Sequence, residues 1–178
     1  WDTTKKDTIL VQRVTREPNL AVECSPHYAN HIVVGGRHQS LNLVDYRLIG
    51  SQNQAITWRQ PQAHSGAILD IKWSPFVPHW IASSGDDAVI HLWDIRFGDK
   101  PVLSLQDHTN SVNKVLWSNS HSDILFSAGA DRVLKLWSAC LEPHHVLGSV
   151  EFAGSVVGAG VNRLGGVYGV CRSGNFKT

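Results

Sequence analysis

Long apolar runs and an excess of charge are both missing from this sequence of 178 residues. No 18 consecutive residues are apolar, and the N-terminus lacks the basic and then apolar pattern of a signal peptide. The net charge is only +1, whereas proteins that bind nucleic acid or anionic membranes usually carry a strong positive field. We therefore expect no insertion into a membrane and no direct contact with nucleic acid.

The sequence contains only three cysteines, and no two of them are close together in the sequence. Cys24, Cys140 and Cys171 are an odd number, and they lack the close pairs of a disulfide framework or a zinc knuckle. A reducing compartment fits this usage. We expect a cytoplasmic location, with a nuclear one as the alternative, and attachment to cytoskeleton or membranes only through partners.

An internal repeat dominates what is present. The stretch from His64 to Asp94 recurs 44 residues later without a gap. A repeat of this length, with a histidine near its start and a Trp-Asp pair at its end, is typical of a four-stranded propeller blade. The chain resembles the WD-repeat β-propeller family. The positions that match are His64 and His108, Trp73 and Trp117, Ser83 and Ser127, Gly85 and Gly129, Asp87 and Asp131, and Trp93 and Trp137.

The resemblance implies an all-β fold, a partial propeller of about four blades, which is about half of a seven-bladed ring. Residues 1–14 would end one blade, 15–60 would form a degenerate blade, 61–106 and 107–152 regular blades, and 153–178 the start of a truncated one. In the degenerate blade His38 replaces the turn aspartate and Val44 replaces the tryptophan. Because an open half-ring would expose apolar faces and strand edges, we expect the remaining blades in a missing part of the chain, with a partner chain as the alternative.

Alternating apolar and polar residues place the strands of each expected blade. They are expected near 20–24, 32–35, 40–44 and 55–60, then 68–73, 80–84, 89–93 and 102–105, then 112–117, 124–128, 133–137 and 145–150. Two more are expected at 155–162 and 167–171, and an outer strand at 8–14.

Each regular repeat contains a histidine, a serine, an aspartate and a tryptophan. The sets are His64, Ser83, Asp87 and Trp93, and His108, Ser127, Asp131 and Trp137. A serine, a histidine and an aspartate are also what acyl transfer uses as nucleophile, base and orienting carboxylate. In the WD-repeat family, however, these residue types form a structural tetrad that ends on the tryptophan N–H. Since a buried indole N–H needs an acceptor and the set occurs twice, we interpret both as structural and expect no enzyme.

Other motifs in the sequence give only weak support for a metal or cofactor site. His144 and His145 are adjacent, and successive residues of a strand point to opposite faces. The segment Gly158-Ala159-Gly160 lacks the third glycine of a dinucleotide loop, and no Lys-Ser or Lys-Thr pair follows as in a phosphate loop. We therefore expect neither a metal nor a cofactor.

Candidates for partner binding lie on the loops. In the wiring that the family implies, the loops entering the first strand of each blade share one rim with the turns after the second strand. Partners of propellers often bind there, and arginine is enriched in binding hot spots. The opposite rim carries the apolar loop from Pro75, in which Phe76 is a docking candidate and Trp80 is interpreted as the start of a buried strand. The candidates on the first rim are Arg37, His38, Asp86, Asn110, Arg132 and Arg172, with Gln39 and Ser65 beside them.

The resemblance predicts a non-catalytic scaffold, a subunit of a multiprotein assembly whose partners are other protein subunits. The repeat is similar to repeats in tethering-complex interactors of endosomal trafficking, peroxisomal import receptors, histone chaperone subunits and dynein intermediate chains. We favour trafficking, motor or ciliary transport. The alternative is a substrate-recognition or adaptor propeller of an enzyme complex, such as a ubiquitin ligase or a chromatin-modifying complex.

Overall fold

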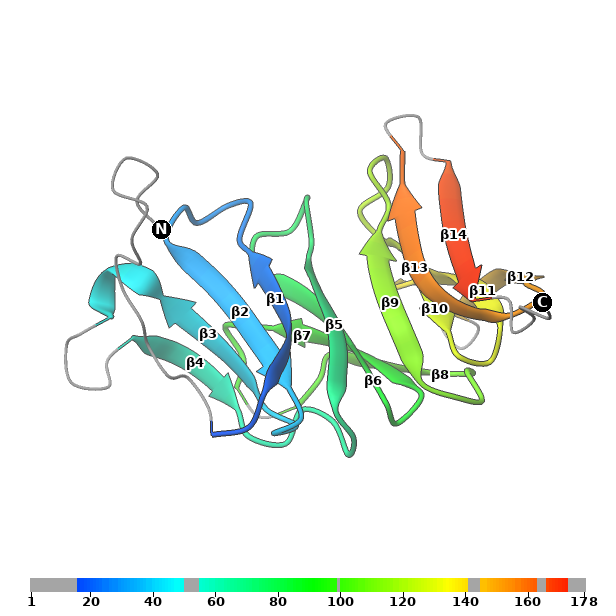
Figure 1. The fold of residues 1–178 in the computed structure, drawn as a ribbon. Helices are drawn as coiled ribbons and strands as arrows, with labels where there is room; N and C mark the ends of the chain where they lie inside the picture. Colours follow the sequence, from blue (N-terminus) through cyan, green and yellow to red (C-terminus); the bar gives the residue numbers. More distant parts are fainter. Residues whose placement is uncertain (1–15, 50–54, 99, 141–144, 163–165, 173–178) are drawn as a thin grey trace, which may run out of the picture.

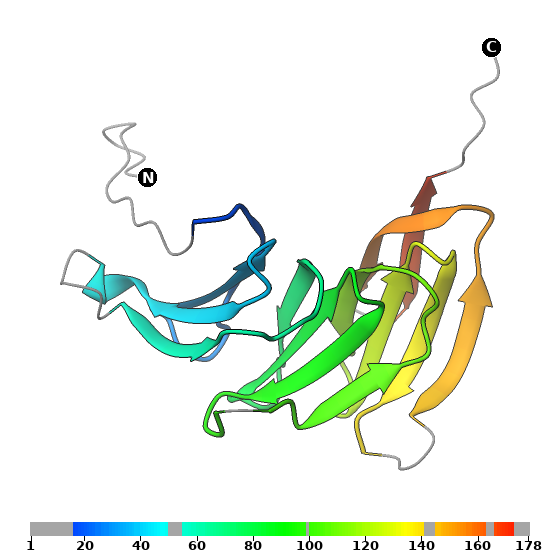
Figure 2. The same ribbon diagram turned by 90° about the horizontal axis from the view of Figure 1, so that it is seen from below.

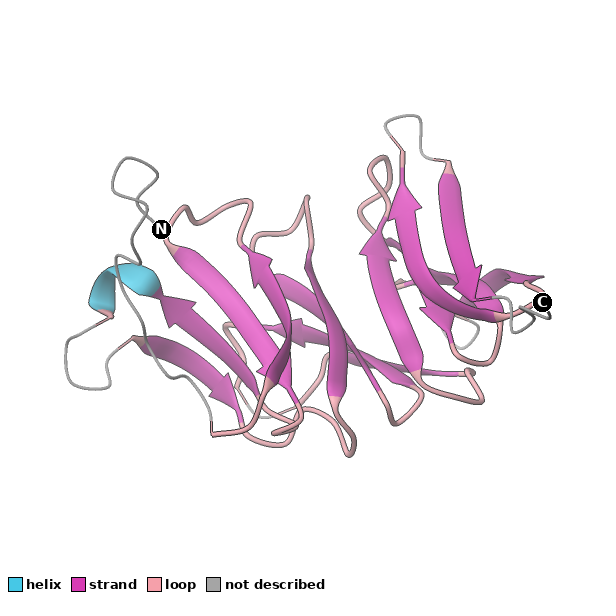
Figure 3. Cartoon of the chain, in the orientation of Figure 1, coloured by secondary structure: helices cyan, strands magenta, loops and turns pink. Residues whose placement is uncertain are grey.

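The regular secondary structure of the described residues is almost entirely β-strand. A computed structural model describes residues 16–49, 55–98, 100–140, 145–162 and 166–172. Its strands form three four-stranded sheets and one two-stranded sheet, joined by loops and one short 3-10 helix, η1 (Tyr46–Leu48) (Figures 1 and 3). The prediction of an all-β, partial propeller is confirmed.

Each four-stranded sheet is a meander in which strands that follow each other in sequence pair antiparallel. The first sheet holds β1 (Asn19–Cys24), β2 (His31–Gly36), β3 (Leu41–Asp45) and β4 (Ile56–Gln60). The second holds β5 (Ile68–Trp73), β6 (Trp80–Gly85), β7 (Val89–Asp94) and β8 (Leu103–Gln106). The third holds β9 (Val112–Trp117), β10 (Ile124–Gly129), β11 (Val133–Ser138) and β12 (Val146–Glu151). The two-stranded sheet pairs β13 (Ser155–Val161) with β14 (Val167–Arg172).

All fourteen strands begin and end within one residue of the expected positions. The agreement follows from the burial pattern, because alternate residues of the strands face the neighbouring sheets. In β5, for example, Ile68, Ile71 and Trp73 are buried while Lys72 is partly exposed. The outer strand expected at 8–14 lies outside the described residues.

The first strands of successive sheets lie side by side, and the sheets spread outward from them. Figure 1 shows β1, β5, β9 and β13 in a row, and Figure 2 shows the sheets diverging from that row. Apolar residues fill the space between neighbouring sheets: Val33, Leu41 and Ile71 belong to the core between the first two. Leu92 and Val115 belong to the core between the second and third.

Hydrogen bonds cross between the sheets at their inner strands. The Trp117 indole N–H donates to the Lys72 carbonyl at 3.1 Å, and the Val115 N–H donates to the buried Asp70 carboxylate at 3.2 Å. Lys72 in turn pairs with Glu23 of β1 at 2.8 Å. These contacts join three consecutive sheets and fix the angle between them.

The meander places the loops on two rims. We call top rim the turns between the second and third strands together with the segments entering each inner strand. The bottom rim holds the loops that follow the first and third strands. One position in each top turn has a positive φ although it is not glycine: Gln39 (60°), Ala88 (64°) and Arg132 (69°). The three turns therefore share one backbone conformation, as the repeat predicts.

Candidate functional site: two tetrads and two rims

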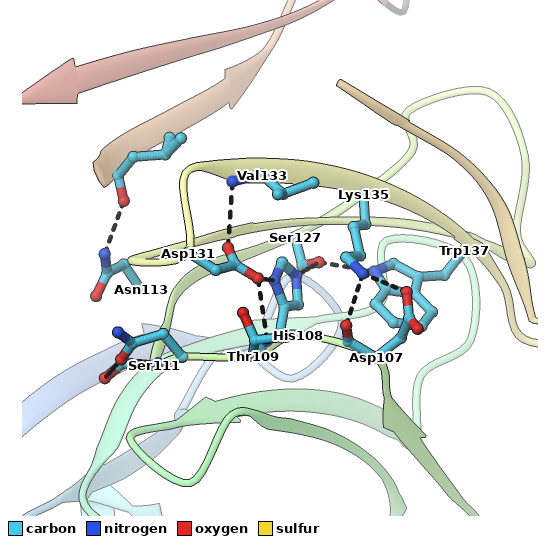
Figure 4. Close-up of polar contacts among 12 residues, drawn as sticks. Asp107, His108, Thr109, Ser111, Asn113, Ser127, Asp131, Val133, Lys135 and Trp137 are labelled. Carbon is cyan, nitrogen blue, oxygen red and sulfur yellow. Dashed lines mark hydrogen bonds and ion pairs between the residues drawn. The ribbon is translucent and has the colours of Figure 1, made fainter. Parts of the chain in front are cut away.

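The third sheet brings its four expected residues into one hydrogen-bonded chain (Figure 4). His108 lies between two partners, with Nδ1 at 2.6 Å from Asp131 Oδ2 and Nε2 at 2.6 Å from Ser127 Oγ. The Trp137 indole N–H donates to the same Ser127 Oγ at 2.7 Å. An anionic Asp131 accepts the proton on Nδ1, so the Ser127 hydroxyl donates to Nε2.

The second sheet repeats this chain with its own residues. His64 Nδ1 lies 3.0 Å from Asp87 Oδ1, and His64 Nε2 lies 2.8 Å from Ser83 Oγ. The Trp93 indole N–H donates to Ser83 Oγ at 2.9 Å. The two sets are therefore alike in geometry as well as in sequence.

The turn after the second strand is shaped to deliver the aspartate. Asp87 accepts the backbone N–H of Ser65 at 2.9 Å and that of Val89 at 3.3 Å, so it holds the histidine loop and its own turn together. Gly85 leaves the room for this: a Cβ there would lie 2.5 Å from both Asp87 Oδ1 and His64 Nδ1. Gly129 serves the same purpose in the third sheet, where a Cβ would lie 2.5 Å from Asp131 Oδ1.

Burial decides what the tetrads can do chemically. The side chains of His64 and His108 are 0% and 1% exposed. Burial lowers the pKa of His108 although Asp131 acts in the opposite direction, so the ring is neutral. Burial is also the largest single influence on Asp131 and opposes its ionisation, but the interactions with His108 and the backbone N–H groups of Val133 and Thr109 together hold the pKa of the carboxyl below its usual range. Each ring nitrogen of the two histidines and each serine oxygen already has a hydrogen-bond partner within its tetrad.

One further histidine, His91, comes close to the second tetrad and was not expected from the sequence. Within the described residues, donor atoms of His64, Asp87 and His91 gather within 4.8 Å, as a metal site would require. Both ring nitrogens of His64 already bond to tetrad partners, however, and His91 Nδ1 bonds to Ser104 Oγ at 2.8 Å. A cation would therefore have to break the tetrad.

The pKa of His91 nevertheless departs from its ordinary value. Burial, and then the neighbouring His64, lower its pKa to about 4. It lines an open cleft of about 650 Å³ between the first two sheets. Of the histidine pair considered above, His145 Nδ1 lies 2.9 Å from the Ser138 carbonyl oxygen, and His144 lies outside the described residues.

The first sheet replaces its tetrad with apolar packing. Val34 and Val44 occupy the places of the serine and the tryptophan, and they pack with Ala55 in a small buried cluster. His38, in the place of the aspartate, has Nδ1 at 2.7 Å from Ser40 Oγ and Nε2 at 3.0 Å from Asn19 Oδ1. Burial lowers the pKa of His38, and nearby Arg59 lowers it further. His38 thus ties its turn to β1 and is less free for a partner than we expected.

The other top-rim candidates are exposed, and two of them have contacts within the chain. Asp86 accepts the Ser111 hydroxyl at 2.5 Å across two neighbouring sheets, and Asn110 Oδ1 accepts the Ser111 N–H at 2.8 Å. Gln39 donates to the Ser65 carbonyl at 3.0 Å, again between neighbouring sheets. The candidates whose side chains face solvent are Arg37, Asp86, Asn110, Arg132 and, at the end of β14, Arg172.

On the bottom rim, Phe76 is 44% exposed, whereas Trp80 begins β6 and stacks on Trp117 with ring centroids 6.4 Å apart. Sequence reasoning missed two ion pairs beside this loop. Arg47 and Arg96 pair with Asp45 and Asp94, each at 2.6 Å. The motif Asp-x-Arg occurs twice at an offset of 49 residues, which was the available signal.

A comparison with protein families matches the chain to the EIPR1 β-propeller over residues 3–137. This match covers most of the sequence, including both tetrads. The chain belongs to the EIPR1 β-propeller family. The prediction of a WD-repeat propeller is thereby confirmed at the level of the family.

Curated relatives of this EIPR1-family propeller are proteins of several kinds. Coronin-2A of Bos taurus is 37% identical over 84 residues, covering 42% of this chain and 15% of its own length. The GATOR2 complex protein MIOS of Dictyostelium discoideum is 28% identical over 122 residues, covering 68% of this chain and 10% of its own length. The EARP-interacting protein homolog of Gekko japonicus is 32% identical over 69 residues, covering 39% of this chain and 18% of its own length.

The chain thus spans 10% to 18% of the length of these relatives. Two of their names refer to an assembly or to an interaction partner, which supports protein partners in general. In the described part of this EIPR1-family chain, no helix has the length and apolar character needed to cross a bilayer. Its three cysteines, Cys24, Cys140 and Cys171, are free thiols.

Proposed function

We propose that this chain is part of a non-catalytic scaffold that holds other protein subunits in a multiprotein assembly, and that the assembly serves intracellular transport in the cytoplasm. The observation that carries the proposal is that the polar residues of both tetrads are hydrogen-bonded to one another. The histidines, serines and aspartates that could do chemistry are buried in the tetrads, and they stabilise the sheets. The rims are the surfaces that we expect other proteins to contact.

The relatives support the same conclusion. Two of them are named for complexes, as a GATOR2 complex protein and as an EARP-interacting protein homolog, which makes a multiprotein setting for this chain the simplest reading. A tethering-type assembly fits the resemblance to trafficking proteins, and localisation to membranes or cytoskeleton then comes from the partners.

The experiment that tests the scaffold role is purification of the full-length protein, tagged at its own locus, under mild conditions. Quantitative mass spectrometry of what copurifies should show a defined set of proteins in near-stoichiometric amounts. Recovery of the protein alone would contradict the proposal. A set dominated by a ubiquitin ligase or a chromatin-modifying enzyme would overturn the transport assignment in favour of an adaptor role.

The top rim can be probed in the same purification. Arg132 is exposed and belongs to no core cluster, so changing it to glutamate should alter the free energy of unfolding by no more than about 0.5 kcal/mol. Because arginine is frequent in binding hot spots, we expect Arg132→Glu to reduce the recovery of at least one subunit. Unchanged recovery would remove Arg132 from the binding surface.

A further inference from the structure

Exposed large hydrophobic side chains are distributed unevenly over the molecule. Eight of them lie on β1, β12, β13 and β14, toward the two ends of the row of sheets. Every other one in the described residues lies on the bottom rim of the first two sheets, and none lies in a top-rim loop. These bottom-rim residues are Tyr28, Tyr46, Leu48, Phe76, Phe97 and Val102.

We use the name lower aromatic patch for Tyr28, Tyr46, Phe76 and Phe97 together with Arg47 and Arg96. Phe97 is 67% exposed and the other three aromatic residues are 41% to 44% exposed. Tyrosine, phenylalanine and arginine are the residue types enriched at protein interfaces. Isolated exposed hydrophobic residues need no explanation, so the question is whether these six form one surface.

Contacts between the loops show that the patch is continuous. The Tyr46 hydroxyl donates to the Ala29 carbonyl at 2.7 Å, which joins the connection after β3 to the loop after β1. His27 Nε2 lies 2.8 Å from the Ser74 carbonyl oxygen, which joins the loop after β1 to the loop after β5. The Phe76 N–H donates to Ser74 Oγ at 3.3 Å, so Phe76 is fixed beside that junction.

The rings continue this connection across the two sheets. Tyr28 packs edge-on against Trp73 of β5, with ring centroids 6.2 Å apart. The Ile95 N–H donates to the His79 carbonyl at 3.0 Å, which joins the segment after β7 to the loop after β5. The Arg96 guanidinium lies 5.3 Å from the centroid of the Phe97 ring.

Both arginines are held in place by carboxylates beneath them. Arg96 donates from Nε to Asp94 Oδ1 at 3.0 Å and from Nη2 to Asp94 Oδ2 at 2.6 Å. Arg47 makes the same pair of bonds to Asp45. The aspartate side chains are 5% exposed, whereas Arg47 and Arg96 are 61% and 56% exposed.

The consequence is a pair of preorganised cationic groups. Each guanidinium uses Nε and Nη2 inward, so its Nη1 remains for an anion outside the molecule. Since the side chains are already fixed, binding such an anion costs little additional rotamer entropy.

The charge of the surrounding loops selects the kind of partner. In the described loop residues 25–30, 46–49, 74–79, 95–98 and 100–102, the charged side chains that face solvent are Arg47, Arg96 and Lys100, and no carboxylate is among them. Asp99 lies outside the described residues. Asp45 and Asp94 offset the charge of the two arginines but are buried, so the groups that a partner would contact are cationic or apolar, and acidic and apolar side chains are complementary to them.

We propose that the lower aromatic patch binds an acidic segment of a partner protein, whose carboxylates pair with Arg47 and Arg96 while its apolar side chains cover Phe76 and Phe97. The proposal rests on the scaffold role, which it extends by naming a surface and a partner chemistry. An anionic membrane is a poorer match, because membrane-binding clusters generally gather four to eight basic residues.

The experiment uses the full-length protein and a phage library of random 16-residue peptides. Selected peptides should be enriched in aspartate and glutamate next to aliphatic or aromatic residues. The best of them, synthesised with a fluorophore, is then titrated with each variant by fluorescence anisotropy. Arg96→Glu should weaken binding at least tenfold and Phe76→Ala at least threefold, while Arg16→Glu, an exposed arginine before β1 at the other rim, should stay within twofold.

Two controls separate the proposed contact from loss of structure. A peptide with lysine in place of its essential acidic residue should regain binding to Arg96→Glu, which a misfolded variant could not show. Phe76→Ala removes an exposed side chain that belongs to no core cluster, so its melting temperature should match the wild type. These results together would support the patch.

Several outcomes would overturn the proposal. Selected peptides without acidic enrichment would do so, as would peptide binding by Arg96→Glu and Phe76→Ala that equals binding by the wild type. Capture of the wild type by phosphatidylserine vesicles that Phe76→Ala abolishes would point to a membrane instead. A dimer in light scattering that Phe76→Ala dissociates would point to a second copy of the chain. Failure of the scaffold role would look different. If no partners copurify with the wild-type protein, the scaffold role is refuted. If the full set of partners copurifies with Phe76→Ala as with the wild type, only the proposed role of the patch is refuted.

Discussion

Replacing His108 with alanine tests the structural interpretation of the tetrads. The substitution removes a charge-assisted hydrogen bond to Asp131 and a neutral one to Ser127, which are worth about 1.5–3 and 0.5–1.5 kcal/mol. Asp131 keeps the backbone N–H groups of Val133 and Thr109, at 3.1 and 3.2 Å, so it is not left alone. We expect the free energy of unfolding to fall by about 2–4 kcal/mol.

Urea unfolding followed by tryptophan fluorescence measures this loss. With a slope of about 2 kcal/mol per molar urea, the midpoint should move down by about 1–2 M while the slope stays the same. His121→Ala is the matched control, because His121 is exposed in the loop between β9 and β10 and its described hydrogen bonds are made by its backbone. That variant should stay within about 0.5 kcal/mol of the wild type. Equal effects of the two substitutions would refute the structural interpretation.

The turn after β6, His91 and the junction between the second and third sheets can each be tested by substitution. Ala88→Gly should stabilise the protein by about 0.5–1 kcal/mol in thermal melts, because φ is 64° there, while Ala130→Gly, in the equivalent turn but without a positive φ, should not. The His91 pKa of about 4 lies below the ordinary value of 6.5, so the unfolded chain binds the proton first and stability should fall as pH drops from about 6.5 to 4, by up to about 3 kcal/mol. In His91→Gln this part of the pH dependence should vanish from urea midpoints measured across that range; an unchanged profile would mean that His91 is not its source. Asp70→Ala leaves the buried Val115 N–H without its acceptor and should cost about 1–3 kcal/mol in urea unfolding, and a loss below 0.5 kcal/mol would show that this contact does not hold the sheets together.

The strands and the tetrads could be predicted because the repeat contains two independent patterns. Alternation places residues on the faces of each strand, and the recurring His, Ser, Asp and Trp fix the register between strands. The first sheet could be placed only by its offset of 49 residues, since Val34 and Val44 replace the polar pair. Its hydrogen bond from His38 to Asn19 follows from a local rearrangement that no pattern in the sequence encodes.

Contacts between sheets could not be predicted from the sequence. Trp117 reaches the carbonyl of Lys72, and His27 that of Ser74, only because the sheets pack at a particular angle. Backbone carbonyls carry no sequence signal, so such partners stay invisible until the packing is known. The surface formed by Tyr28 and Phe97 was missed for the same reason, because the two residues belong to different sheets.

We infer that this propeller acts by holding other proteins. Native mass spectrometry of the full-length protein, purified at its natural abundance, tests this claim most directly. We predict a particle whose mass exceeds that of the protein by the summed masses of partner subunits in whole-number ratios. A single species with the mass of the protein alone would contradict the account.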